Sequence, residues 1–282
     1  MDVPMSRIAR ALGAEVASSV PVGGGSIAAA LRVDLADGRR AFVKLGRGLP
    51  AGMLAAEAAG LAALRSGGCE VPEVWFAADD LLVLAWIEAA PWSEASRVAL
   101  GRGLAAQHRV TRDTCGFPCD TFLGHTRQPN PDESDLLAFF RDHRLGMIQR
   151  RLRDAGQLDA AASRQIDALR ERLGALIPVE GERPALLHGD LWTGNALADA
   201  SGRAWIFDPA AHYGHREADV AMTLLFGSFG ETVLDAYTER FPLAPGWRER
   251  VPLFNLYHLL NHALLFGGGY LGQAMAVVRR FG

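Results

Sequence analysis

The chain has 282 residues, of which 49% are hydrophobic and 22% charged, so it can bury a large core and is neither a disordered nor a fibrous polymer. Its 29 Lys and Arg residues against 32 Asp and Glu residues give a formal net charge of -3, which offers no electrostatic footprint for nucleic acid or an anionic membrane. The longest apolar run, residues 81–87, is far shorter than the roughly 20 residues of a spanning helix. We therefore expect a cytoplasmic protein with no nucleic-acid and no membrane partner.

The first part of the chain has the pattern of a small antiparallel sheet with one helix. Apolar and polar residues alternate up to an Asp-Gly turn, so residues 27–45 predict a β-hairpin. Residues 54–64 carry an apolar face at helical spacing, and this face includes the carboxylate of Glu57. Residues 74–77 and 81–87 predict a second pair of strands.

The rest of the chain reads mostly as helix, and no Gly-, Ser- or Pro-rich linker separates it from the first part. Ser93 can cap one helix, residues 134–153 repeat apolar residues along one side, and a further helix surrounds Leu169. The arginines of residues 134–153, Arg144 among them, are interpreted as a solvated face. Two lobes joined by one hinge fit this pattern better than two independent domains.

The most informative stretch runs from His188 to Asn195 and reads HGDLWTGN, and an FDP triplet containing Asp208 follows it. Phosphoryl transfer from a nucleotide needs a carboxylate that orients the attacking hydroxyl and takes its proton, together with oxygen ligands for Mg²⁺. Asp190 is the candidate for the first role, and Asn195 and Asp208 are candidates for the second. Either motif alone could be an ordinary turn or strand exit, but their order and spacing favour the functional interpretation.

The first part of the chain contains candidates for the phosphate-binding groups that such a site needs. Lys44 follows the predicted hairpin turn and could reach the α- and β-phosphates. An ionised Glu57 on a buried helix face is costly unless it is paired, and Lys44 is its nearest candidate partner. A loop of three glycines and a serine, residues 23–26, precedes the hairpin and could lie over the phosphates.

These motifs belong to longer segments that resemble the fructosamine kinase (ketosamine-3-kinase) family, within the wider protein-kinase-like and aminoglycoside-phosphotransferase-like group. The similar segments span nearly the whole chain and are GGGS at 23–26, FVK ending at Lys44, TFLGHTRQPN at 121–130, LLHGDLWTGN at 186–195, FDPAAHYGHREADVAM at 207–222 and LYHLLNHALLFGGGY at 256–270. Small-molecule kinases widely share HGDLWTGN and FDP, whereas the other segments point to the narrower family.

The resemblance implies an α+β, bilobal protein-kinase-like fold, with a small N-terminal antiparallel β-sheet lobe plus one helix and a larger, mainly helical C-terminal lobe. Residues 1–86 would form the nucleotide-binding lobe, and residues 87–282 the catalytic and substrate-binding lobe. It also implies an enzyme that uses ATP and Mg²⁺ to phosphorylate the 3-hydroxyl of ketosamines, which are fructosamine or ribulosamine adducts. Phosphorylation makes such an adduct labile, so the activity would serve deglycation.

The resemblance also implies roles for individual residues. Asp190 would be the catalytic aspartate, Asn195 and Asp208 the metal ligands, Lys44 the phosphate lysine and Glu57 its partner. The further cofactor-binding candidates are the loop residues Gly23, Gly24, Gly25 and Ser26 and the inter-lobe hinge residues Leu84, Trp86 and Glu88. The substrate-binding candidates are Trp192, Tyr213 and His262. Asp219 resembles the buried aspartate that braces the catalytic loop through its backbone amides.

Other interpretations of the same machinery stay open. One is a kinase for another small hydroxyl compound, such as an aminoglycoside or an amino alcohol, and another is a nucleotide-binding pseudokinase. No segment after Asp208 closes with an Ala-Pro-Glu element, which disfavours a regulated activation loop and protein-kinase activity. The expected partners are a small sugar-amine substrate and, as a further possibility, glycated protein lysines, and the expected state is a monomer or weak dimer.

Overall fold

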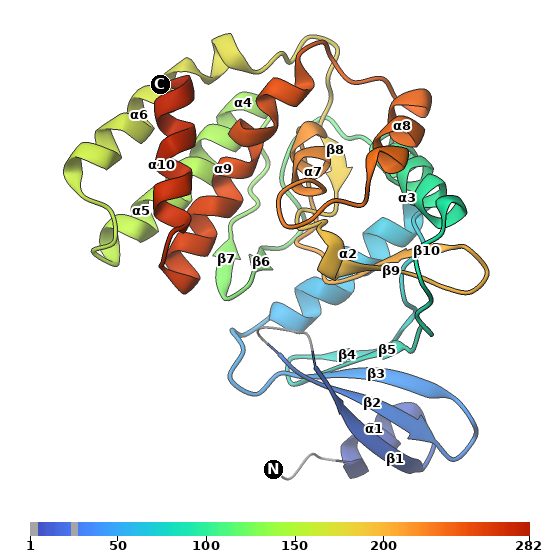
Figure 1. Ribbon diagram of the computed structural model, residues 1–282. Helices are drawn as coiled ribbons and strands as arrows, with labels where there is room; N and C mark the ends of the chain where they lie inside the picture. Colours follow the sequence, from blue (N-terminus) through green and yellow to red (C-terminus); the bar gives the residue numbers. More distant parts are fainter. Residues whose placement is uncertain (1–4, 24–27) are drawn as a thin grey trace.

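A five-stranded antiparallel sheet forms the smaller lobe of the computed structural model, which describes residues 5–23 and 28–282 (Figure 1). The spatial order of the strands is β1-β2-β3-β5-β4. These strands are β1 (Val16–Val22), β2 (Ala29–Leu35), β3 (Arg40–Leu45), β4 (Val74–Ala78) and β5 (Leu81–Ala85). The predicted hairpin and strand pair are thus present, with Ala29 opposite Leu45 in the β2–β3 register.

The small lobe contains two elements that the sequence pattern did not predict, the helix α1 (Met5–Leu12) and the edge strand β1. The prediction of one helix in this lobe therefore omitted α1. Ile8 and Leu12 of α1 cover the outer face of the sheet. Most of β1 is exposed, so it lacks the alternation that marks a half-buried strand. Pro21 within it is consistent with a position at the sheet edge.

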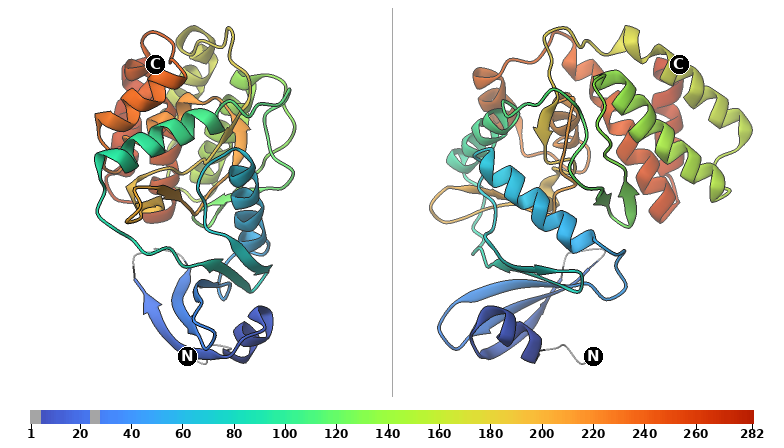
Figure 2. Two further views of the ribbon diagram at one scale, coloured as in Figure 1. Left: turned by 90° about the vertical axis from the view of Figure 1, so that its right-hand side faces the viewer. Right: turned by 180° about the vertical axis from the view of Figure 1, so that it is seen from behind.

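The alternation along β3 divides its side chains between two environments. Ala41 and Val43 point to the face that α1 covers and are fully buried there. Phe42 and Lys44 point to the opposite face, toward the larger lobe. Helix α2 (Met53–Ser66) lies on this second face, between the sheet and the larger lobe, as the right-hand view of Figure 2 shows. The period of two in the strand therefore directs Lys44 toward α2.

The larger lobe is built mainly from helices, with short two-stranded sheets between them (Figure 1). Its helices are α3 (Glu94–Gln107), α4 (Leu136–Ala138), α5 (Met147–Asp154), α6 (Ala160–Leu176), α7 (Glu217–Met222), α8 (Glu231–Arg240), α9 (Trp247–Phe266) and α10 (Tyr270–Phe281), together with the π-helix η1 (Phe139–Gly146) and the 3-10 turn η2 (Thr193–Asn195). Its strands are β6 (Thr121–Leu123), β7 (Thr126–Gln128), β8 (Ala185–Leu187), β9 (Ala196–Ala198), β10 (Ala204–Ile206) and β11 (His212–Gly214). The predicted domain boundary at 86/87 falls directly after β5 and stays a prediction.

The predicted helix over 134–153 differs from the structure in its middle, where η1 replaces regular α-helix between α4 and α5. Two arginines compete for main-chain carbonyls there: Arg170 donates from Nε to the Arg141 carbonyl, and Arg144 donates to the His143 carbonyl. The prediction of a solvated arginine face is wrong for Arg144. Its side chain is buried, and Nη2 donates to Oδ1 of Asn130 at 2.7 Å.

Two large hydrophobic clusters hold the molecule together. One fills the larger lobe between α5, α6, α9 and α10. The other joins the lobes, because it combines Leu54 and Leu61 of α2 with Leu104 of α3 and Leu191 of the HGDLWTGN segment. Within residues 5–23 and 28–282, no helix has both the length and the apolar composition that crossing a bilayer requires.

Candidate active site

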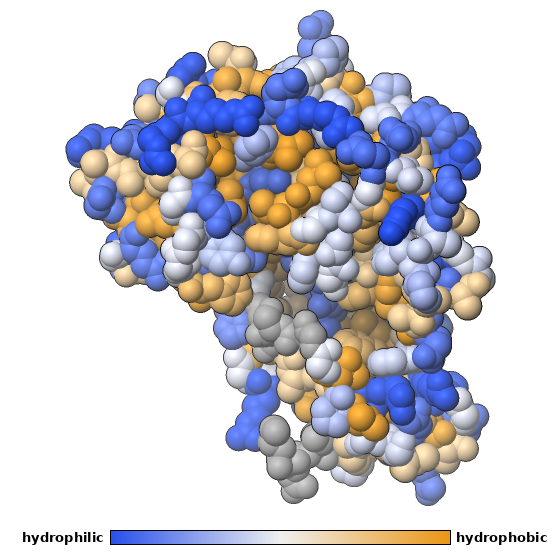
Figure 3. Space-filling view, in the orientation of Figure 1, coloured by the Kyte–Doolittle hydropathy of each residue, from blue (hydrophilic) through white to orange (hydrophobic). Residues whose placement is uncertain are grey.

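A cavity of about 410 Å³ lies between the two lobes, where the surface in Figure 3 is hollowed. This volume is typical of a small-molecule binding site. The sheet and α2 form one wall, and the HGDLWTGN and FDP segments form the opposite wall. Five polar side chains that are far apart in the sequence meet in this cavity, namely Lys44, Glu57, Asp190, Asn195 and Asp208.

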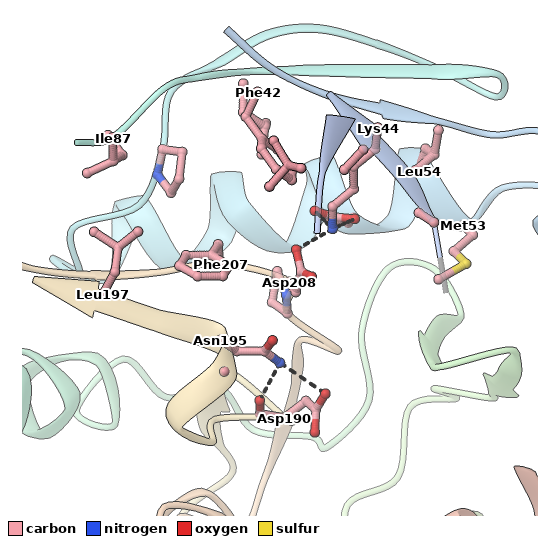
Figure 4. A pocket seen from close by; sticks show the side chains of 18 of the residues that line it. Phe42, Lys44, Met53, Leu54, Ile87, Asp190, Asn195, Leu197, Phe207 and Asp208 are labelled. Carbon is pink, nitrogen blue, oxygen red and sulfur yellow. Dashed lines mark hydrogen bonds and ion pairs between the residues drawn. The ribbon is translucent and has the colours of Figure 1, made fainter. Parts of the chain in front are cut away.

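Lys44 is held by two carboxylates from different parts of the fold. Its Nζ donates to Oε1 and Oε2 of Glu57 at 2.8 and 2.9 Å, and it also donates to Oδ1 of Asp208. Figure 4 shows Lys44 pointing down from the sheet to Asp208. The side chains of Lys44 and Glu57 are each only 8% exposed, whereas that of Asp208 is 37% exposed. Lys44 thus links the sheet to α2 and to the FDP segment.

The charges of these three groups depend on one another. Burial opposes the charge of Lys44, but Asp208 and Glu57 together raise the pKa of Lys44 above its ordinary value. Burial raises the pKa of Glu57, and the neighbouring Asp208 adds to this rise while Lys44 opposes it. For Asp208, burial is outweighed by Lys44, which lowers the pKa of this carboxyl. Lys44 therefore stays charged at neutral pH and can pair with a further anion.

Asp190 and Asn195 lie on the opposite wall of the cavity. Nδ2 of Asn195 donates to the main-chain oxygen of Asp190 at 2.9 Å and to its Oδ2 at 3.1 Å. Both bonds use the amide nitrogen, so the amide oxygen of Asn195 points elsewhere, toward the side of Asp208 in Figure 4. The turn η2 closes the loop between the two residues. This turn fixes the position of Asp190, the candidate base, relative to Asn195, the candidate metal ligand.

The loop that carries Asp190 is braced from below by Asp219 of α7, as the resemblance implied. Oδ2 of Asp219 accepts from the His188 amide at 2.6 Å, and Oδ1 accepts from the Gly189 amide at 2.8 Å. Gly189 has φ 81°, and a Cβ atom there would lie 2.3 Å from the Ala210 carbonyl oxygen. Only glycine fits this position without distortion. The sharp turn before Asp190 therefore depends on a missing side chain and a buried carboxylate.

Asp208 has an unusual backbone conformation. Among the described residues it is the one non-glycine residue with positive φ, at 57°. Such conformations are sparsely populated and persist where the surrounding structure enforces them, often at functional sites. The preceding Phe207 is held at both ends, since its amide donates to the Asn195 carbonyl and its carbonyl faces Nε2 of His188 at 2.9 Å. These contacts turn the Asp208 carboxylate toward the cavity.

The environment of Asp190 makes its carboxyl harder to ionise than an exposed one. Burial raises the pKa of Asp190 well above its ordinary value, and the negative charges of Asp208 and Asp219 act in the same direction. The hydrogen bond from Asn195 opposes this rise. A carboxylate with a raised pKa is a stronger base than an exposed one, which suits a group that takes a proton from a hydroxyl.

The predicted hinge residues are divided between the cavity and the outside. Leu84 and Trp86 line the cavity. The Trp86 amide donates to the Arg40 carbonyl at 3.1 Å, so this N–H is already used within the protein. Glu88 is not part of the cavity lining that the structure describes, and its carboxylate bonds Arg40 and the Trp86 indole instead. Gly23 lines the cavity, whereas the predicted loop residues Gly24, Gly25 and Ser26 lie outside the described residues.

Comparison with known proteins identifies the family of this chain. A family model described as fructosamine kinase matches residues 4–281. This chain belongs to the fructosamine kinase family. A probable ketoamine kinase of Synechocystis sp. is 38% identical over 254 residues, which cover 87% of this chain and 84% of that protein. The chloroplastic protein-ribulosamine 3-kinase of Arabidopsis thaliana is 35% identical and covers 91% of this chain and 80% of its own length.

Solved structures agree with this family assignment. A crystal structure from Thermobifida fusca, described as a candidate fructosamine-3-kinase, is 37% identical, has a TM-score of 0.90 and covers 99% of this chain and 98% of its own. A macrolide 2'-phosphotransferase from Brachybacterium faecium is only 16% identical, and its TM-score of 0.60, over 96% of this chain and 95% of its own, shows a shared fold. The chain is therefore a phosphotransferase with a bilobal protein-kinase-like fold.

The three acceptor candidates of this fructosamine kinase family member lie in different places. Trp192 lines the cavity, and its indole meets the Phe226 ring edge-on at 6.2 Å. His262 lies next to the same Phe226, at 4.4 Å between ring centroids, and joins an aromatic cluster at the edge of the site. Tyr213 is not brought to the cavity lining that the structure describes, and its ring lies under the Arg112 guanidinium instead.

The sequence reasoning missed two features of the site. The first is the apolar lining, which includes Leu49, Met53, Ile87, Leu197 and Phe207. Leu197 stands two residues after Asn195, so the alternation of β9 could have indicated that it faces the cavity as well. The second is His258 of α9, whose Nδ1 lies 3.9 Å from Oδ1 of Asp190. No local signal marks His258, because most residues around it on α9 are buried.

Proposed function

We propose that this member of the fructosamine kinase family transfers the γ-phosphate of ATP to the 3-hydroxyl of a ketosamine. The observation that carries the proposal is the meeting of Lys44, Glu57, Asp208, Asn195 and Asp190 around one cavity. These are the groups that nucleotide-dependent phosphoryl transfer requires: a phosphate-binding lysine with its carboxylate partner, oxygen ligands for a divalent cation, and a base.

The nucleotide end of the cavity would be the part near the small lobe. The apolar side chains of Phe42, Leu84 and Ile87 offer a dry slot for a planar base. Lys44 would pair with the α- and β-phosphates as a point charge, and Glu57 would keep its ammonium in place. Because Lys44 already bridges to Asp208, its ammonium group would be held in place before the phosphates enter the site.

The oxygen atoms of Asp208 and Asn195 suit Mg²⁺, which is a hard cation that prefers carboxylate and carbonyl oxygens. The partly exposed Asp208 carboxylate and the Asn195 amide oxygen, which is turned away from Asp190, would hold it. Held there, Mg²⁺ would supply positive charge that neutralises the negative charge developing on the phosphates during transfer. The positive φ of Asp208 keeps its carboxylate turned toward this position.

Asp190 would act on the acceptor. The acceptor oxygen bonds to the γ-phosphorus, the bond from that phosphorus to the bridging oxygen of ADP breaks, and the hydroxyl proton passes to the Asp190 carboxylate. Its raised pKa, caused mainly by burial, supports this role as a base. The bond from Asn195 to Oδ2 orients the carboxylate, so that catalysis depends on position as well as on basicity.

The acceptor class rests on the relatives, whose names state ketoamines and protein-bound ribulosamines. Trp192 offers an apolar indole face next to Asp190, against which a sugar ring can pack. His262 lies at the far side of the adjoining aromatic cluster, where the amine-bearing end of the acceptor would lie. Small ketosamines and ketosamine-modified lysines on proteins are both proposed as acceptors, with deglycation as the physiological result.

The test is formation of ADP by the purified enzyme with ATP, Mg²⁺ and fructosyl-lysine or ribulosyl-lysine. Phosphorus NMR of the product should show a monoester on the 3-hydroxyl. Asp190→Ala should lower kcat by about 10² to 10⁴ through loss of the base. An acceptor panel containing an aminoglycoside and an amino alcohol provides the comparison. Turnover of one of these without turnover of any ketosamine would replace the proposed acceptor class.

A further inference from the structure

His258 projects from α9 toward the catalytic carboxylate. Its Nδ1 lies 3.9 Å from Oδ1 of Asp190. The residue is only 5% exposed, and this Nδ1 has no hydrogen-bond partner among the described residues. A buried ring nitrogen without a partner costs free energy, so its presence next to a catalytic group calls for an explanation.

The two oxygens of the Asp190 carboxylate have different neighbours. Oδ2 accepts from Nδ2 of Asn195 at 3.1 Å, whereas the closest ring nitrogen to Oδ1 is Nδ1 of His258. The carboxylate therefore lies between an amide that already holds one oxygen and an imidazole that stands about 1 Å beyond hydrogen-bond distance from the other. Catalytic hydrogen bonds are often this long before substrate binds and shorten in the reactive complex.

The imidazole of His258 is neutral at physiological pH. Burial lowers its pKa to about 3, and the neighbouring His262 and Arg144 act in the same direction while Asp219 opposes them. A neutral imidazole carries its proton on one nitrogen only. A carboxylate in front of Nδ1 favours the tautomer in which Nδ1 holds the proton, because the other tautomer would place a lone pair against a negative charge.

We propose that His258 is a positioning residue for the catalytic base: its Nδ1–H donates a hydrogen bond to Oδ1 of Asp190 once nucleotide and acceptor fill the cavity. This inference rests on the proposed function. With Asn195 on one oxygen and His258 on the other, the carboxylate has a single orientation toward the acceptor hydroxyl. The same bond stabilises the ionised form of Asp190, which its surroundings otherwise disfavour.

Other charged and titratable groups also act on this pair and have to stay constant in a test. Asp190 faces the negative charges of Asp208 and Asp219, both of which raise its pKa. Tyr257, the neighbour of His258 on α9, is also influenced by Asp190. The groups around His258 are His212, His262, Arg144, Tyr257 and Asp219. None of them needs to be changed in the variants below.

Two substitutions separate the hydrogen bond from the shape of the ring. His258→Asn keeps an N–H donor close to the position of Nδ1, whereas His258→Phe keeps a ring and removes the donor. Because the bond forms in the substrate complex, its loss in His258→Phe should move the acidic limb of the kcat profile, which reports that complex, upward by about one pH unit. His258→Asn should restore most of the activity and bring this limb back to within a few tenths of a unit of the wild type.

A matched control is His215, which is also 5% exposed and whose ring packs on Phe254, one turn before His258 on α9, at 4.9 Å. Its Nε2 faces the Pro178 carbonyl at 3.1 Å, away from Asp190. His215→Phe should lower the thermal unfolding temperature and leave the acidic limb unchanged. If His215→Phe and His258→Phe moved the acidic limb of the pH profile equally, His258 would support the fold and would not position Asp190.

A second readout does not require turnover. Nitrogen NMR of the labelled imidazole, assigned by its disappearance in His258→Asn, should show Nδ1 protonated in the complex with Mg²⁺, a non-hydrolysable ATP analogue and the ketosamine. An unprotonated Nδ1, or an acidic limb that stays in place or moves downward in His258→Phe, would overturn the inference. If the wild type phosphorylated no ketosamine but Nδ1 were protonated, the proposed acceptor would fail while the His258–Asp190 contact would stand.

Discussion

Gly60 of α2 and Pro209, the residue after Asp208, pack so closely that a Cβ atom on the glycine would lie 2.9 Å from Cγ of the proline. Glu57 lies one helical turn before Gly60, on the same side of α2. The helix that carries the partner of Lys44 is therefore in direct contact with the segment that carries Asp208. This contact lets one ammonium reach both carboxylates.

Gly60→Ala should impair the nucleotide site although alanine is the better helix former by about 1 kcal/mol. The added methyl group would push α2 away from the proline ring and separate Glu57 from Lys44. We expect KM for ATP to rise several-fold, as steady-state kinetics can measure. Gly103→Ala in α3 is the control, because the nearest heavy atom to a Cβ there is 4.0 Å away. That variant should be slightly stabilised and keep its KM, and equal effects of both variants would contradict the packing argument.

Lys44→Met should reduce both activity and stability. Removing the ammonium leaves the buried Glu57 without its cation and Asp208 without its nearest positive charge. Breaking a buried pair in this way typically costs about 3 to 5 kcal/mol. Chemical denaturation should report that loss, and ATP binding measured by calorimetry should weaken strongly.

The comparison for Lys44 is Arg40 on the same strand. Its side chain is 54% exposed and forms ion pairs with Glu88 at 3.1 Å and with Asp34 at 3.3 Å. Such pairs contribute little, so Arg40→Met should change stability by less than about 0.5 kcal/mol. If Arg40→Met lost as much unfolding free energy as Lys44→Met, the loss would come from disturbing the strand and not from breaking the buried ion pair.

Asp190→Asn should lower kcat as strongly as Asp190→Ala does and at the same time stabilise the fold at neutral and alkaline pH. The folded-state pKa of Asp190 is raised, mainly by burial, so the folded protein binds this proton more tightly than the unfolded chain does. The carboxyl therefore costs stability as pH rises from its unfolded pKa, near 3.9, through the folded value. An uncharged amide avoids this cost, in line with the trade-off between activity and stability at active sites.

Unfolding temperatures measured from acidic to alkaline pH can check this prediction. The gap between Asp190→Asn and wild type should be small at low pH, where the wild-type carboxyl is protonated, and should widen as pH rises. Asn195→Asp would place a further carboxylate next to Asp190 and should have the opposite effect. A stability gap that does not depend on pH would mean that ionisation of Asp190 is not the cause.

The sequence predicted those parts of the structure that depend on local periodicity. The alternation of the β2–β3 hairpin and the apolar face of α2 are properties of neighbouring residues, so both elements were expected close to their observed bounds. The meeting of Lys44 with Asp208 was expected from the resemblance to a family, since no local pattern relates two residues in different lobes.

Two residues show where sequence reasoning fails. Arg144 was expected in solvent because a run of arginines usually lies on the surface, but it is buried in the lobe, where its two terminal nitrogens donate to the Pro129 carbonyl and to Oδ1 of Asn130. His258 gave no signal because α9 is buried on most of its circumference. The burial of a charged or polar residue depends on partners that the tertiary fold supplies, and these partners are not visible in the local pattern.

Trp192 provides a test of acceptor binding that is separate from nucleotide binding. A Cβ atom on Gly194 would lie 2.3 Å from the Trp192 ring, so the indole is packed onto the glycine and meets Phe226 edge-on on another side. Trp192→Ala should raise KM for the ketosamine about tenfold and leave KM for ATP within about twofold, because a lost aromatic face is worth roughly 1.4 kcal/mol or more. Gly194→Ala should have a similar but smaller effect by displacing the indole. If both variants weakened ATP and acceptor equally, Trp192 would support the loop and would not contact the sugar.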